Sequence, residues 1–141
     1  MFDRVVLGVR VLFGISYLCH GLRWFIPGFW PMPQPEPGPG TEVVGALISA
    51  EAYGLFNMFD LVKVIEILAG LSWILGLWVP LTLVAVMPIT MIIFFVDVLV
   101  IASPSGYFWG GTSMALHTFL MFSYLVHYRP LLERNAQPGW R

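Results

Sequence analysis

Four long apolar stretches constrain the fold of this chain more than any other feature of its sequence. They run over residues 5–26, 58–78, 80–102 and 107–128, and residues 103–106 between the last two are expected to form a turn. A helix rises about 1.5 Å per residue, so each stretch of about 20 residues crosses a hydrocarbon core of roughly 30 Å. Backbone groups inside lipid must hydrogen-bond within their own segment, and these stretches are therefore predicted to be helices rather than strands.

The composition shows why such stretches need a membrane around them. Of 141 residues, 58% are hydrophobic and 11% are charged. A soluble domain is about a quarter charged, because its surface faces water. We therefore predict an all-α fold, a single integral membrane four-helix bundle over residues 1–141, with the lipid bilayer around it. The net charge of −1 and the lack of a basic stripe argue against nucleic acid as a partner.

The one long connection, residues 27–57, divides into two parts. Proline recurs through residues 31–40, which are expected to be extended rather than helical. Thr41 then provides an N-cap, and Glu42 puts a negative charge in the first helical turn, where the helix dipole favours it. Apolar residues follow at helical spacing, which predicts a short amphipathic helix on the membrane surface or over one end of the bundle.

The basic residues indicate an orientation. Arg4 and Arg10 lie near the N-terminus, and the tail 129–141 holds three more arginines, whereas residues 27–57 contain glutamates but no lysine or arginine. Four spans place both termini on one side, and the positive-inside rule assigns that side to the cytoplasm. The long loop is then expected to face outward and the tail to be cytoplasmic.

Ionisable residues interrupt or border all four apolar stretches. They are His20, Arg23, Lys63, Glu66, Asp97 and His117. Counted by the helical rise in the predicted orientation, all six lie in the outer half of the membrane. Charge at that depth costs several kcal/mol unless it is paired or faces a cavity, so it usually marks a site. A ligand or proton-handling site with His20, Glu66 and His117 as polar contacts is one interpretation.

A structural interpretation of the same residues stands beside it. Lys63 with Glu66, and Arg23 with Asp97, can form ion pairs that set helix register without any chemistry. Haem ligation by His20 and His117 is a third alternative. Their estimated depths differ by roughly 6 Å, which is unfavourable for one haem between two histidines. No spacing of histidine and glutamate supplies three ligands, so no metal site is predicted.

Each predicted span carries one polar or aromatic face. Lys63, Glu66 and Gly70 share a stripe at i, i+3 and i+7, where the glycine permits close approach of another helix. Comparable stripes on the other spans consist of Arg10, Tyr17, His20 and Trp24, then Thr90, Phe94 and Asp97, and then Ser113, His117, Tyr124 and His127. These faces are expected to point inward and to give the bundle a polar core.

Residues 59–70 contain the pattern K-x-x-E-x-x-x-G, followed by V-P-L at 79–81 and by Pro88 within the third stretch. The first stretch contains His20-Gly21-Leu22 and then Arg23. In these features the chain resembles the DoxX-like family of small four-helix membrane proteins, although the family usually has lysine where Arg23 stands. The likeness covers most of the chain except the proline tract and the tail.

The resemblance implies a multi-pass protein of a bacterial-type inner membrane, with His20, Arg23, Lys63 and Glu66 at the family's polar positions. Relatives include subunits associated with thiosulfate:quinone oxidoreductases. The expected function is thus an accessory subunit of a larger membrane oxidoreductase or electron-transfer complex, with other membrane subunits as partners and the polar cluster near a quinone or a proton path.

Two other functions stay open. One is a purely structural subunit that stabilises a larger membrane assembly, and the other is a small-molecule transporter. No nucleophile beside a base and no phosphate-binding loop stands out in the sequence. No catalytic residue is therefore assigned, and the chain is not expected to be a complete enzyme alone.

Overall fold

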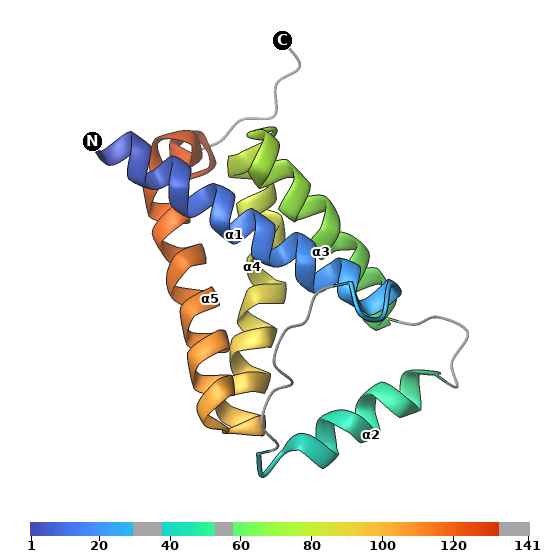
Figure 1. Cartoon of the computed structure of the whole chain (residues 1–141). Coiled ribbons are helices and arrows are strands. Elements are labelled where there is room, and N and C mark those ends of the chain that lie inside the picture. The colour runs from blue at the N-terminus through green and yellow to red at the C-terminus, as the bar shows by residue number, and fades with distance from the viewer. Residues whose placement is uncertain (30–37, 53–57, 133–141) are drawn as a thin grey trace.

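Every element of the computed structural model is helical within the residues that it describes, 1–29, 38–52 and 58–132 (Figure 1). The α-helices are α1 (Phe2–Phe25), α2 (Thr41–Ala52), α3 (Met58–Leu75), α4 (Val79–Phe94) and α5 (Pro104–Ser123). A π-helical segment, η1 (Phe95–Ile101), continues α4, and a 3₁₀ segment, η2 (Leu125–Leu132), follows α5. The all-α prediction is confirmed for this part of the chain.

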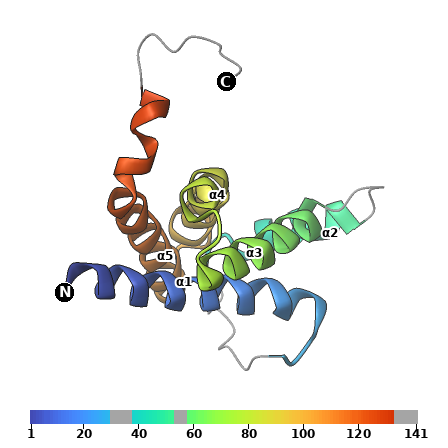
Figure 2. The same cartoon turned by 90° about the horizontal axis from the view of Figure 1, so that it is seen from above.

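The helices form two antiparallel pairs that cross each other. α1 packs along α3, and α4 with η1 packs along α5 (Figure 1). Seen from above, α1 passes across α4 and α5 rather than running parallel to them (Figure 2). The N-terminus and η2 lie at one end of the molecule, and α2 lies at the other end.

Glycines allow α1 and α3 to pack backbone against backbone. A Cβ atom on Gly70 would lie 2.6 Å from the backbone nitrogen of Leu18 and 2.7 Å from the carbonyl oxygen of Gly14. A Cβ on Gly21 would lie 2.8 Å from the carbonyl oxygen of Lys63. No larger residue fits at these distances, so the predicted close approach at Gly70 is confirmed.

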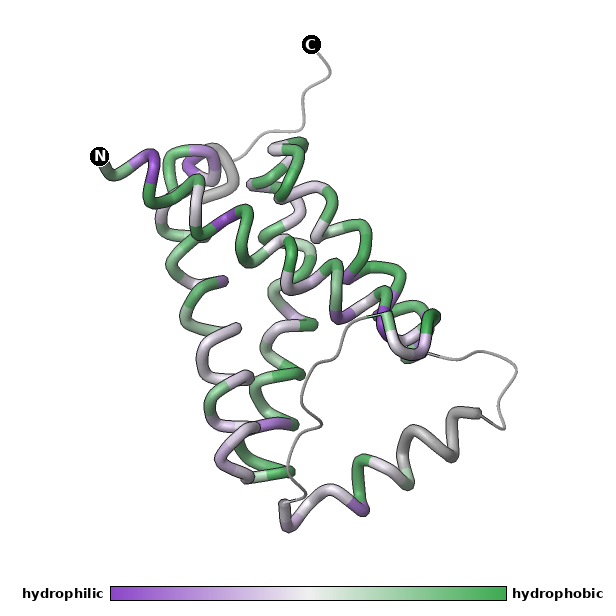
Figure 3. Tube along the Cα trace, viewed as in Figure 1, coloured by the Kyte–Doolittle hydropathy of each residue, from purple (hydrophilic) through white to green (hydrophobic). Residues whose placement is uncertain are grey.

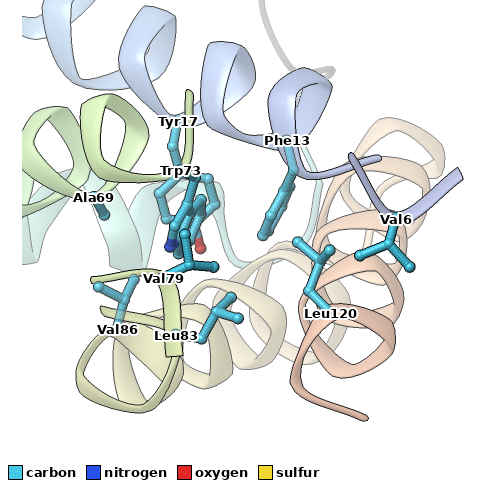
Figure 4. Packing of buried hydrophobic residues seen from close by; sticks show 9 residues of the cluster. All are labelled: Val6, Phe13, Tyr17, Ala69, Trp73, Val79, Leu83, Val86 and Leu120. Atoms are coloured by element: carbon cyan, nitrogen blue, oxygen red, sulfur yellow. The ribbon is translucent and has the colours of Figure 1, made fainter. Parts of the chain in front are cut away.

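The interior holds both apolar and polar side chains. The buried apolar cluster, shown in Figure 4, consists of Val6, Phe13, Tyr17, Ala69, Trp73, Val79, Leu83, Val86 and Leu120. Glu66, Thr90, Ser103 and His117 are buried as well. The exterior, in contrast, is rich in large apolar side chains, among them Leu12, Leu81 and Phe122, which are 68%, 67% and 69% exposed. Colouring by hydropathy shows apolar residues along most of α1, α3 and α4 (Figure 3).

Among the residues that the structure describes, two helical stretches are long and apolar enough to cross a membrane, Phe2–Phe25 and Val79–Ile101. They correspond to the first and third predicted spans. The helix in the second predicted span, 58–78, is shorter than expected, since α3 ends at Leu75. Gly76 and Trp78 have φ values of +75° and +50°, left-handed conformations that separate the end of α3 from the start of α4 at Val79.

The fourth predicted span, 107–128, is shifted and divided. Residues 103–106 were expected to form a turn but make the start of α5 instead. The Ser103 hydroxyl accepts a hydrogen bond from the Gly106 nitrogen at 3.1 Å, and Pro104 occupies the first helical position, where its missing N–H is not needed. α5 ends at Ser123, and η2 runs to Leu132, so the predicted tail 129–141 begins within η2.

The predicted helix in the long loop is confirmed as α2. Most of α2 lies away from the crossed pairs, and its contacts with them are to η1 and α3 (Figure 1). Gly38 and Gly40, just before α2, press against the backbone carbonyls of Ile101 and Val100, where no Cβ fits. Residues 30–37, 53–57 and 133–141 lie outside the described residues, and with them most of the proline tract.

Candidate functional site

A partly open pocket lies between the two helix pairs. α1, α3, α4, η1 and α5 all contribute to its wall; its cavity volume is about 40 Å³, and the atom-free space rises to about 390 Å³ when the open mouth is counted. The lining residues are Ser16, Tyr17, His20, Glu66, Ile93, Asp97, Trp109 and Ser113. The fold therefore brings three of the six predicted site residues, His20, Glu66 and Asp97, to one wall.

The innermost charged group of the pocket is the Lys63–Glu66 ion pair. The Lys63 Nζ atom lies 2.9 Å from Oε1 and 2.8 Å from Oε2 of Glu66, so it binds both carboxylate oxygens. The Glu66 side chain is 1% exposed and that of Lys63 is 16% exposed. The buried Glu66 carboxylate is thus paired with a lysine side chain that stays partly exposed at the surface of the bundle. This is the first of the two ion pairs expected from the sequence.

The second expected pair, Arg23 with Asp97, does not form. In the described part of the chain, Lys63–Glu66 is the ion pair present. Near the C-terminal end of α1, the Trp24 indole nitrogen donates to Asp60 at 2.6 Å, so an aromatic residue and not Arg23 ties the end of α1 to the start of α3.

Asp97 lies in the π-helical segment and faces α5. A Cβ atom on Gly110 would lie 2.8 Å from the Asp97 Cβ, so glycine at 110 lets the aspartate side chain pass between η1 and α5. π-Helical turns are rare and occur often at functional sites, because they re-aim a side chain that a regular α-helix would direct elsewhere. Nothing in the sequence pattern indicated this segment.

A chain of hydrogen bonds joins the pocket wall to His117. The Tyr17 hydroxyl lies 2.5 Å from Thr90 Oγ1, which lies 2.6 Å from His117 Nδ1. The other ring nitrogen, Nε2, lies 2.9 Å from the carbonyl oxygen of Leu83. His117 is fully buried and does not line the pocket. With both nitrogens engaged, it has none left for a haem iron, and the arrangement does not fit haem ligation by His20 and His117.

Aromatic rings pack against the hydrogen-bonded residues Tyr17 and His117. Phe13 stacks on Trp73 with centroids 5.0 Å apart, and the Tyr17 ring meets the Trp73 ring edge to face at 4.9 Å (Figure 4). The His117 imidazole contacts Phe13 and Trp73 at 5.8 Å and 5.6 Å. Aromatic contacts of this kind add about 0.5–1.5 kcal/mol beyond burial, so they restrict how the Tyr17 and His117 rings turn.

The polar faces predicted for α1, α4 and α5 do meet inside the bundle. Besides the Tyr17–Thr90–His117 chain, the Arg10 guanidinium donates to the Tyr124 hydroxyl at 3.1 Å. The charge of Arg10 also lies beside Gly76 at the C-terminus of α3, the end of a helix that favours a cation. Tyr17, Thr90 and Ser113 were recognised as members of polar stripes but not as site residues. Their helical spacing was the available signal.

Comparison of the chain with protein-family models, with curated proteins and with solved structures finds no match in any of the three.

Proposed function

We propose that the chain is a multi-pass protein of the DoxX-like type in a bacterial-type inner membrane, with both termini cytoplasmic. Its role is that of an accessory subunit of a larger membrane oxidoreductase, in which the pocket holds the head of a quinone. The observation that carries the proposal is a pocket lined by His20, Glu66 and Asp97 in a molecule with an apolar exterior. Ionisable groups in such surroundings usually serve a ligand or a proton path.

The pocket suits a flat ring that carries polar groups. Ile93 and Trp109 supply apolar and aromatic wall, while Ser16 and Ser113 add hydroxyl groups on facing helices. A quinone has a lipid-soluble tail and a head that needs hydrogen-bond partners at membrane depth. The pocket is partly open, and α1, α3, α4, η1 and α5 all contribute lining residues, so the ring would lie among the helices within the depth of the proposed membrane.

Four spans are the arrangement that best accommodates this fold. α3 and α5 have 18 and 20 residues, which rise about 27 Å and about 30 Å. Each is the antiparallel partner of one of the two long apolar helices. α3 carries three charged residues, Asp60, Lys63 and Glu66. Lys63 and Glu66 neutralise each other, and Asp60 lies in the first turn of the helix, so these charges are no obstacle to insertion beside α1.

The test is binding of a short-chain quinone, decylubiquinone, to the full-length protein purified in mild detergent. Leucine at Ser113 fills the pocket, and Ser113→Leu is expected to weaken binding at least about tenfold. Thr112→Leu is the matched control, because Thr112 is exposed on the same helix and does not line the pocket. Equal binding by both variants and the native chain would refute a quinone site in this pocket.

A purely structural subunit is the second candidate, and the closed Lys63–Glu66 pair favours it, since each charge already has its partner. The two functions differ in what Glu66→Gln does in native membranes. With a quinone site, the variant lowers quinone-linked activity while the protein still co-purifies with its complex. With a structural role, the variant lowers quinone-linked activity only in proportion to the loss of assembled complex.

A further inference from the structure

The proton on the buried His117 can be assigned from its two partners. Nε2 faces the carbonyl oxygen of Leu83, which only accepts hydrogen bonds, so Nε2 carries a proton. The ring is fully buried among aromatic side chains, and no carboxylate of the described residues pairs with it. A charged imidazole there would be costly, so the ring is neutral and Nδ1 is an acceptor.

This assignment determines which group donates in each hydrogen bond of the Tyr17–Thr90–His117 series. The Thr90 hydroxyl has one proton and donates it to His117 Nδ1 at 2.6 Å rather than to the Val86 carbonyl at 3.4 Å. Thr90 Oγ1 then accepts from the Tyr17 hydroxyl at 2.5 Å. The Tyr17 proton therefore points toward α4, and its phenol oxygen offers only lone pairs to any further partner.

The two carboxylates of the pocket, Glu66 and Asp97, are hydrogen-bond acceptors like the Tyr17 oxygen. Both oxygens of Glu66 already accept from Lys63, and their remaining lone pairs also accept. The Asp97 side chain makes no hydrogen bond or ion pair with any residue in the described ranges, so its carboxylate oxygens are open acceptors. Ser16 and Ser113 can serve in either sense, since a hydroxyl both donates and accepts. His20 and Trp109 also line the pocket, and each ring brings one N–H donor, but the oxygens of Tyr17, Glu66 and Asp97 outnumber these two donors.

We infer that the pocket selects a ligand that donates hydrogen bonds and, on the proposed function, binds the hydroquinone form in preference to the quinone. A quinone head presents two carbonyl oxygens, which only accept hydrogen bonds. Where such an oxygen faces the oxygen of Tyr17 or Asp97, neither atom has a proton to donate. A hydroquinone head presents two hydroxyl groups that donate. One hydrogen bond gained or lost in a desolvated site changes affinity about tenfold.

The experiment compares decylubiquinone with decylubiquinol, kept reduced without oxygen, by titration calorimetry on the full-length protein in lipid nanodiscs. Mildly alkaline buffer keeps Asp97 ionised. The hydroquinone is expected to bind about tenfold more tightly than the quinone. Tyr17→Phe removes one acceptor and is expected to weaken hydroquinone binding about tenfold, with little effect on the quinone.

Thr90→Val is the decisive variant, because Thr90 does not line the pocket. Valine keeps the size of threonine but gives the Tyr17 proton no acceptor, so the hydroxyl is free to turn and donate to a quinone. The preference for hydroquinone is expected to fall toward equality. Ser123→Ala is the matched control, since Ser123 donates to the Phe119 carbonyl at 2.8 Å and has no link to the chain. Asp97→Asn, which adds a donor to the wall, is a second route to the same shift if Thr90→Val does not fold.

The outcomes separate the two proposals. Equal binding of both forms, tighter binding of the quinone, or an unchanged preference in folded Thr90→Val and Asp97→Asn would overturn the inference and leave the quinone site standing. Binding of neither form, or binding that Ser113→Leu does not weaken, would remove the proposed function itself. Tighter hydroquinone binding that depends on Thr90 supports both.

Discussion

At the level of single residues, Lys63 stabilises the buried Glu66 carboxylate inside an apolar bundle by pairing with its charge. Glu66 is almost fully buried, and its only cation partner among the described residues is three positions earlier on the same helix. The pair forms within α3, so it needs no partner helix. Removing one member of a buried pair leaves the other charge desolvated without compensation, which costs about 3–5 kcal/mol, whereas replacing both by apolar residues is often neutral.

Lys63→Met is therefore expected to lower the free energy of unfolding by about 3–5 kcal/mol, because it strands the Glu66 carboxylate. The double variant Lys63→Met/Glu66→Met should recover most of that loss. Arg4→Met is the control, as it removes the same charge from an exposed position and should change stability by about 0.5 kcal/mol at most. Denaturation of the detergent-solubilised variants, followed by tryptophan fluorescence, measures all three. A double variant as unstable as the single one would show that the pair contributes more than charge balance.

Helix packing at the level of elements depends on where the small residues lie. α1 and α3 approach each other through Gly14, Gly21 and Gly70, and the contacts at Gly70 are with backbone atoms, which cannot rotate away. Gly8 also lies in α1, but nothing lies within 4 Å of its Cβ position. Close backbone approach is a common way for helices to associate in lipid, where no hydrophobic force drives them together.

Gly70→Ala and Gly8→Ala are expected to change stability in opposite directions. The new methyl group at 70 forces α1 and α3 apart, with an expected loss of about 1–3 kcal/mol. Alanine at 8 meets no neighbour and favours the helix by about 0.5–1 kcal/mol. Thermal unfolding of the purified variants gives the sign of each effect. A neutral Gly70→Ala would mean that the two helices pack less closely than the structure shows.

At the scale of the whole molecule, several polar side chains are buried beside the apolar core, and many large apolar side chains are exposed. Glu66, Thr90 and His117 are buried, whereas leucines, valines and phenylalanines cover the helices. In water this distribution would expose much of the apolar surface, and lipid is the solvent that suits it. The two helix pairs cross (Figure 2), and the pocket is lined by residues of both pairs.

Single-cysteine labelling tests the proposed four-span topology. In a Cys19→Ala background, Asp3→Cys is expected to be protected from a membrane-impermeant maleimide in intact cells, because the proposed topology places the N-terminus in the cytoplasm. Glu42→Cys at the exposed start of α2 is expected to react, since α2 lies at the opposite end of the bundle. Lysed cells should label at both positions and provide the control. Reaction at Asp3 alone would reverse the orientation, and equal reaction at both in intact cells would contradict the four spans.

Much of the helical structure and part of the site were accessible from residue patterns. Thr41 and Glu42 marked the start of α2 correctly, and Lys63, Glu66 and Gly70 were placed on one face because α-helical spacing is a local property. The ends of helices were less accessible. Ser103 and Pro104 were taken for a turn although they start α5, since the same residues serve both structures. The π-helical turn at Asp97 left no local pattern at all.

The sequence by itself determined the helices, their polar faces and the Lys63–Glu66 pair, because each depends on residues only a few positions apart. Tertiary structure alone decided which faces meet. The Tyr17–Thr90–His117 chain joins residues 73 and 27 positions apart, and it exists only at the observed crossing of α1, α4 and α5. In the same arrangement Arg23 and Asp97 do not pair, and Asp97 lines the pocket. Helix crossing follows from the fit of many side chains at once, which no single segment specifies.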